Sequence, residues 1–214
     1  MLKRSLVIAA MLVTLAAGAP AAQRAGQKPP AKEPPPDYFP LPAGAWWKYR
    51  STTDAGASSE FTMKVSGEEK LGDVTAILVD IESVWPIREW YSKGGGVVAW
   101  HREAFLKNNQ SADFAPGRIA LKNPLATGQT WSWRGSGVMN VAIEESATVV
   151  GPEDVVVPAG SFKAMKVSWK VTQGGTAVTK TYWYANWIGL VKSITDTGSI
   201  RATTELMDWS FRKR

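Results

Sequence analysis

Two carboxylates, Asp80 and Glu82, stand two positions apart in a stretch where Ile77, Val79 and Ile81 take the alternate positions. On a strand, such positions share a face, with Cβ atoms roughly 6.5–7 Å apart. This spacing suits a glycosidase acid and base, whose carboxyl groups lie about 5–9.5 Å apart, or oxygen ligands of a hard cation. Because the alternate face is apolar, a solvated outer face is the simpler interpretation, and a hydrolase using Asp80 and Glu82 is the less favoured alternative.

The single histidine, His101, shares a strand face with Glu103 and could act with it as a general base. Its nucleophile would have to be Ser or Thr, and no Gly-x-Ser-x-Gly elbow presents one. We therefore expect an exposed or hydrogen-bonded histidine. One His and no Cys exclude multi-histidine metal sites, thiolate chemistry and disulfides. The sequence predicts no catalytic residue, no metal and no cofactor, and hence a protein that is not an enzyme.

Eleven tryptophans in 214 residues are the unusual feature of the composition. Each buries about 150–250 Å² when packed, so core filling accounts for most of them. Several nevertheless fall where they could share a groove: Trp131 and Trp133 are two positions apart, and Trp90 and Trp100 flank a glycine run. We predict that some of this set line a site for an acyl chain or stack against sugar rings. The candidate ligand-binding residues are Trp85, Trp90, Trp100, Trp131 and Trp133.

The elements that position these residues have period 2. Apolar residues alternate with polar ones in 60–66, 77–82 and 165–172, which predicts strands with one buried face. Glycines at 94–96 and 174–175 and the Pro158-Ala159-Gly160 segment predict hairpin turns. The best helical candidate is a short turn over 103–112. The spacing predicts nine to eleven antiparallel strands in an all-β fold, a curved meander sheet or half-barrel, with a two-sheet β-sandwich as the alternative.

The N-terminal region has the order of a secretory signal. Lys3 and Arg4 precede an apolar run over 6–17, and Ala19-Pro20-Ala21 supplies small residues for cleavage after Ala21. We expect a signal peptide over 1–21, with an uncleaved anchor as the alternative. Five prolines mark residues 22–37 as a Pro-rich disordered linker. Residues 38–214 then form a single antiparallel β domain, located in the periplasm or outside the cell.

Three short segments together resemble a known family. They are Tyr38-Phe39-Pro40-Leu41 with Gly44-Ala45-Trp46-Trp47-Lys48-Tyr49, then Val157-Pro158-Ala159-Gly160-Ser161-Phe162, then Tyr182-Trp183-Tyr184-Ala185 leading to Gly189-Leu190-Val191-Lys192. Their order and spacing resemble the TapB-like family of exported bacterial proteins, a domain of unknown function. The resemblance implies an exported β domain akin to the half-barrels of LolA and LolB, and it implies no catalytic residues. This chain departs from the pattern at Asn186-Trp187-Ile188, where a different turn is expected.

These observations favour a non-enzymatic binding or interaction domain of the cell envelope. The expected ligand is hydrophobic or amphipathic, such as a lipid or acyl chain. A glycan-binding module that uses exposed tryptophans is the alternative, and an envelope protein that pairs with strand edges is a further partner class. No nucleic-acid motif is present, and we expect no transmembrane span in the mature chain.

Overall fold

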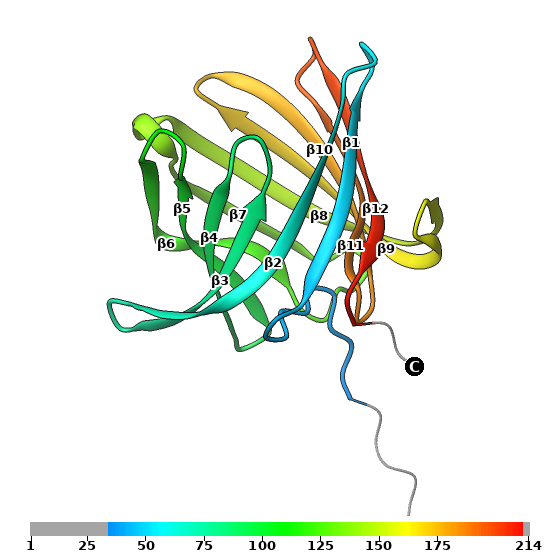
Figure 1. The fold of residues 1–214 in the computed structure, drawn as a ribbon, viewed down its shortest axis with the longest axis horizontal. Helices are drawn as coiled ribbons and strands as arrows, with labels where there is room; N and C mark the ends of the chain where they lie inside the picture. The colour runs from blue at the N-terminus through cyan, green and yellow to red at the C-terminus, as the bar shows by residue number, and fades with distance from the viewer. Residues whose placement is uncertain (1–33, 212–214) are drawn as a thin grey trace, which may run out of the picture. The chain divides into compact units, whose positions relative to one another are not determined.

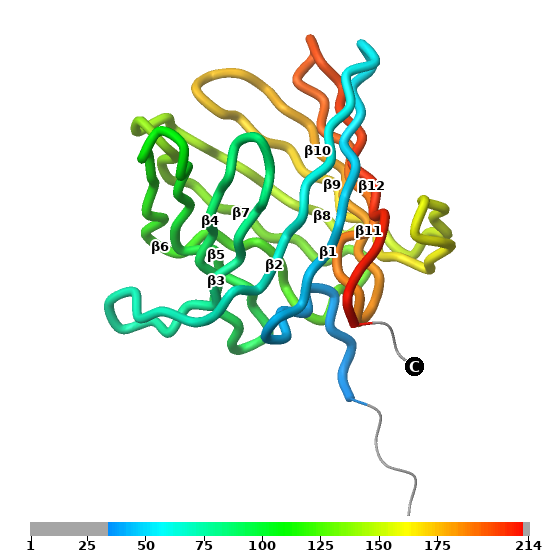
Figure 2. The backbone as a smooth tube through the Cα atoms, viewed as in Figure 1, coloured from blue at the N-terminus to red at the C-terminus, as the bar shows by residue number. Residues whose placement is uncertain are grey.

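The computed structural model describes residues 34–211, which form one antiparallel sheet of twelve strands. The sheet curls into a nearly closed barrel (Figures 1 and 2), which confirms the all-β half-barrel prediction over the sandwich. The predicted signal peptide and most of the predicted linker lie outside the described residues. The strands are β1 (Trp46–Thr53), β2 (Ser58–Leu71), β3 (Val74–Glu82), β4 (Ile87–Gly94), β5 (Val97–Phe105), β6 (Gln110–Lys122), β7 (Thr130–Ser136), β8 (Ala142–Val157), β9 (Gly160–Gln173), β10 (Thr176–Ala185), β11 (Gly189–Asp196) and β12 (Arg201–Trp209).

The predicted hairpin turns are confirmed at β4–β5, β8–β9 and β9–β10. Gly95 and Gly96 take φ of 57° and 74°, values that glycine adopts without a Cβ clash. The helical turn predicted over 103–112 is wrong, because β5 continues to Phe105 and β6 starts at Gln110. A tight turn with Asn109 at φ 53° joins these strands. Within the described residues the one helical element is a 3-10 turn, η1 (Val138–Asn140).

The barrel interior is built by strict alternation of inward and outward side chains. In β8, residues 143, 145, 147 and 149 are buried and their neighbours are exposed. Local register shifts occur in several strand pairs, including Val65/Gly67, Trp90/Tyr91 and Trp183/Tyr184. Such bulges increase the local right-handed twist of a sheet. They help a long meander to bend far enough for its two ends to meet.

The two edges of the sheet are β6 and β7, because β1 pairs with both β2 and β12. No strand ladder joins β6 to β7 in the described chain, and side chains close this seam instead. Arg118 on β6 makes two contacts with the carboxylate of Glu145 on β8, from Nε at 2.7 Å and Nη2 at 2.6 Å. The Trp133 indole on β7 donates to the carbonyl of Pro116 on β6 at 2.8 Å. The seam is therefore a side-chain interface, with only 11% of Arg118 and 2% of Glu145 exposed.

A strap formed by residues 37–42 crosses one end of the barrel (Figure 1). Asp37 anchors the strap through three residues. Its carboxylate forms an ion pair with Lys93 at 2.6 Å and accepts a hydrogen bond from the Asn123 side chain. Its N–H donates to Oδ1 of Asn186 at 2.9 Å. The N–H of Trp187, at φ 60°, donates to the Asp37 carbonyl at 2.7 Å. Residues 186–188, where the chain departs from the family pattern, thus form a turn that is hydrogen-bonded to the strap. This end, where β4–β5, β6–β7 and β10–β11 connect, is called the closed end below.

We expect the seam to contribute strongly to stability. Arg118→Met leaves the Glu145 carboxylate buried without its partner, a change that costs about 3–5 kcal/mol of unfolding free energy. Urea denaturation of the purified protein measures it. Arg134→Met is the matched control, because the Arg134–Glu144 pair is exposed (77% and 57%) and such pairs contribute under about 1 kcal/mol. Equal losses in the two variants would contradict this role of the seam.

Candidate functional site

The barrel encloses a cavity of about 460 Å³. Phe39, Pro40 and Leu41 of the strap line it at the closed end. At the other end the lining reaches Phe105, Ile143 and Gln173. Phe105 and Gln173 are the last residues of β5 and β9, and Ile143 is the second residue of β8. The cavity thus extends along the barrel from the strap toward the end that the strap does not cross. We call this second end the open end.

Ten of the 26 residues that line the cavity are aromatic. Tyr91 stacks on Trp100 with centroids 5.8 Å apart, and Phe39 of the strap packs against Tyr91 at 5.3 Å. Tyr49 stacks on Phe61 at 5.3 Å, and its hydroxyl donates to the Leu190 carbonyl at 2.9 Å. These contacts hold the rings in place and present their faces and edges to the cavity. A concave aromatic site with a few polar groups is typical of pockets for small amphipathic molecules.

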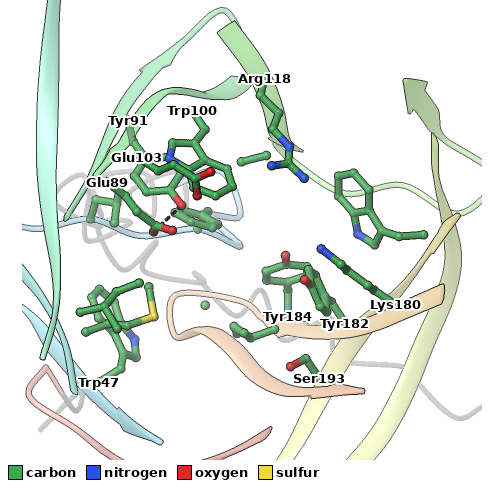
Figure 3. A pocket seen from close by; sticks show the side chains of 18 of the residues that line it. Trp47, Glu89, Tyr91, Trp100, Glu103, Arg118, Lys180, Tyr182, Tyr184 and Ser193 are labelled. Carbon is green, nitrogen blue, oxygen red and sulfur yellow. Dashed lines mark hydrogen bonds between the residues drawn. The ribbon is translucent and has the colours of Figure 1, made fainter. Parts of the chain in front are cut away.

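One wall of the cavity is polar. Lys180, Tyr182 and Tyr184 occupy alternate positions of β10 and point into the cavity, and Ser193 lies opposite Tyr182 on β11 (Figure 3). The Lys180 ammonium makes no hydrogen bond or ion pair with any residue in 34–211. Burial raises the pKa of Tyr184 well above its ordinary value, so its hydroxyl stays protonated. This strand therefore offers one cation and neutral hydroxyl donors to whatever occupies the cavity.

Two carboxyl groups face the same space from the other side (Figure 3). Glu89 is only 8% exposed, and burial raises its pKa to about 7, although the Tyr91 hydroxyl donates to it at 2.8 Å. Burial also raises the pKa of Glu103, although the positive charges of Arg118 and Lys180 act to lower it. Both carboxyl groups are thus easier to protonate than ordinary glutamates.

Arg118 lies between these two walls. Its guanidinium is engaged with Glu145 across the seam and lies over the rings of Trp100 at 4.9 Å and Trp133 at 5.6 Å. Such cation–π contacts stabilise a desolvated guanidinium. Since Arg118 already has these partners, Lys180 is the cation of the cavity that remains available for a ligand.

The five candidate tryptophans do not form one site. Trp100 lines the cavity, whereas Trp90 does not, and its indole donates to Glu69 at 3.2 Å. Trp133 belongs to the seam, and Trp131 is buried edge-to-face against Trp169 at 5.5 Å. Trp85 is 55% exposed in the β3–β4 turn, where Lys107 lies 4.3 Å from its ring centre. Of these five tryptophans, Trp85 is therefore the one whose ring is exposed enough to stack against a glycan.

The proposed carboxylate pair lies away from the cavity. Asp80 forms an ion pair with Arg88 at 2.6 Å, and Glu82 is exposed at the end of β3. Neither residue is part of the cavity lining. His101 is partly buried and hydrogen-bonds through Nε2 to the Ser92 hydroxyl at 2.8 Å, as the sequence led us to expect.

Several cavity residues escaped the sequence interpretation. Trp47 and Trp169 line the cavity, as do the charged residues Glu89, Glu103 and Lys180. A signal for the β10 set exists in the sequence, since Lys180, Tyr182 and Tyr184 recur with period 2. The sequence has no such pattern that identifies Glu89 as a cavity residue, because its burial depends on the closure of the barrel around it.

Comparisons with known proteins support the fold. No protein-family model matches the chain, and no curated protein matches it. Among solved structures, a candidate exported protein with a YmcC-like fold from Bacteroides fragilis aligns with a TM-score of 0.53 and 14% identity, over 81% of this chain and 98% of that one. A candidate lipoprotein from Parabacteroides distasonis aligns with a TM-score of 0.49 and 14% identity, over 83% and 100%. The first likeness supports a shared fold; the TapB-like resemblance stays a prediction.

Glu89 should make the protein less stable as the pH rises. Its pKa is higher in the folded than in the unfolded state, so the folded state binds the proton more tightly. The resulting stability is complete below about pH 4.5 and is lost as the pH rises to about 7. Relative to Glu89→Gln, the wild type should lose up to about 3 kcal/mol across this window, at about 1.4 kcal/mol per pKa unit. Urea denaturation from pH 4 to pH 8 measures the difference.

Glu153→Gln provides the control of opposite sign. The Trp183 indole, followed by Lys166, holds the pKa of the Glu153 carboxyl below its ordinary value. Its contribution is therefore present above the unfolded-state pKa and is lost as the pH falls. A difference between wild type and Glu89→Gln that stays constant over this pH range would show that the Glu89 carboxyl does not titrate as described.

Proposed function

We propose that this chain is an exported, non-enzymatic binding protein of the cell envelope that holds an amphipathic ligand inside the barrel. The observation that carries the proposal is the aromatic cavity of about 460 Å³ with an inward-pointing, unpaired Lys180. Its volume falls within the range of roughly 300–1,000 Å³ common for small-molecule sites. The export part of the proposal is based on the signal-like residues 1–21.

The polarity of the cavity favours a ligand with an acidic head group. The Lys180 ammonium would pair with the charge, and the hydroxyls of Tyr182 and Tyr184 on the same strand face would donate to its oxygens. Hydrogen bonds of this charge-assisted kind are shorter and stronger than neutral ones. The aromatic and aliphatic wall would cover the apolar part of the ligand by area burial. A carboxylate with an alkyl chain has both features.

Membership of the TapB-like family is part of this proposal. The segments that carry the resemblance have identifiable places in the barrel: residues 38–41 lie in the strap, and Pro158-Ala159-Gly160 forms the β8–β9 turn. Tyr182 and Tyr184, from the third segment, face the cavity. The motifs thus contribute to the strap, a turn and one wall of the site.

The proposal is tested by binding of a delipidated sample to a fatty acid, a fatty alcohol and a fatty amine of equal chain length. We expect the acid to bind tightest and to raise the melting temperature, because a ligand that binds only the folded state stabilises it. Lys180→Met should weaken binding of the acid about tenfold, as one charge-assisted hydrogen bond predicts, and leave the alcohol unchanged. Calorimetry and thermal melts give the two readouts.

Lys163→Met is the matched control, since Lys163 is an exposed lysine on β9 outside the cavity lining. It should bind all three ligands like the wild type. Absence of binding for all three would overturn the proposed function. Preference for the amine would instead assign the head-group contact to Glu89 and Glu103 and overturn the role of Lys180.

A further inference from the structure

The open end of the barrel carries exposed apolar side chains on four separate turns. Of the seven large hydrophobic residues that are exposed in the described chain, five lie in the turns of this end. The other two, Val150 and Val156, are on β8. We call the five the apolar rim: Val84 and Trp85 between β3 and β4, Leu106 between β5 and β6, Met139 in η1, and Ile200 between β11 and β12.

The most prominent part of the apolar rim is an ordered tip. The Leu106 N–H donates to the Pro86 carbonyl at 3.0 Å, which ties the β5–β6 turn to the β3–β4 turn. The Ser83 hydroxyl bonds to the backbone of Trp85, donating to its carbonyl at 2.6 Å and accepting from its N–H at 3.1 Å. These contacts fix the backbone of the turn at Trp85, whose side chain is 55% exposed next to Val84 (76% exposed).

Charge is scarce in the turns that form this end. Residues 54–57, 83–86, 106–109, 137–141, 174–175 and 197–200 connect the strands here, and Asp54 and Lys107 are their only charged members. The Lys107 ammonium lies over the Trp85 ring, 4.3 Å from its centre, and this cation–π contact places a cation directly at the apolar rim. The cavity lining extends to this same end through Phe105 and Ile143.

We propose that the apolar rim docks the open end of the barrel onto the surface of a lipid bilayer. The rim residues would enter the headgroup region at shallow depth, where tryptophan and lysine are favoured anchors. Shallow insertion suits them, since the same turns contain Ser, Thr, Asn and Gly residues whose backbone and side chains stay hydrated there. Without residues 1–21, which contain Lys3 and Arg4, the chain has 23 basic and 19 acidic residues, and this formal charge of +4 attracts the protein to a surface with anionic lipids.

A bilayer fits this rim better than a protein partner does. The apolar residues are spread over turns from different parts of the strand order, around an opening, instead of forming one continuous patch. A fluid surface accommodates separate protruding side chains, whereas a protein would need a matching depression for each one. Contact at the open end would also place the cavity mouth against the acyl chains.

Single-cysteine labelling of the full chain tests the proposal. The sequence contains no cysteine, so Val84→Cys and Val156→Cys each accept one environment-sensitive fluorophore. Both positions are similarly exposed (76% and 73%), but Val156 lies next to the β8–β9 turn, which is not among the turns of the open end. With vesicles of phosphatidylcholine containing a minority of phosphatidylglycerol, emission at position 84 should rise several-fold and shift to the blue. Emission at position 156 should stay unchanged.

Vesicle co-sedimentation of serine variants gives the second readout. Trp85→Ser combined with Leu106→Ser should lower the partition coefficient about tenfold, since two apolar side chains no longer leave water. Val150→Ser combined with Val156→Ser is the matched control and should bind like the wild type. A response at position 156 equal to that at position 84, or undiminished binding of the first double variant, would overturn the proposal. Neither readout needs a ligand in the cavity, so failure here leaves the proposed ligand binding to its own test.

Discussion

The ion pair between Arg118 and Glu145 bridges the seam at which the two edges of the sheet meet. A meander of twelve strands ends in two edges, and β6 and β7 meet here without a strand ladder among the described residues. Burying two charges costs desolvation free energy, which is offset only by good geometry and further contacts. Arg118 has both, with two short contacts to Glu145 and aromatic rings from both sides of the seam. Because Arg118 and Glu145 also line the cavity, closure of the barrel and polarity of the site are coupled.

The two ends of the barrel differ in a way that gives the cavity a direction. At the closed end, Asp37 ties the strap to Lys93, Asn123 and Asn186, and Phe39 and Leu41 of the strap line the cavity. The open end has the apolar rim instead. With a bilayer at that end, an amphipathic molecule would move between two apolar environments without crossing water. The proposed ligand site and the proposed docking surface thus fit one arrangement, although they are based on different residues.

Part of this structure follows from the sequence. Alternation in residues 60–66, 77–82 and 165–172 predicted strands because one face of each is buried, and glycine runs located the turns. Trp100 was among the candidate tryptophans and lines the cavity, but Trp90, just across the β4–β5 hairpin, does not. Tyr91 is the residue that pairs with Trp100, and both line the cavity; Trp90 alternates with the cavity residues Glu89 and Tyr91 and pairs with Arg102. Which face of β4 turns toward the cavity is decided when the sheet curls, and local periodicity does not contain it.

The amino-acid sequence by itself determined the fold class, the hairpin pattern and the supply of aromatic residues, because these depend on local alternation and turn chemistry. The tertiary structure alone decided which tryptophans face the cavity, that Glu89 is buried with a pKa of about 7, and that Lys180 makes no hydrogen bond or ion pair within the described barrel. Those properties arise from residues far apart in the chain, brought together when the sheet curls and Arg118 meets Glu145. Burial and charge pairing are consequences of that closure, and no short segment of sequence specifies them.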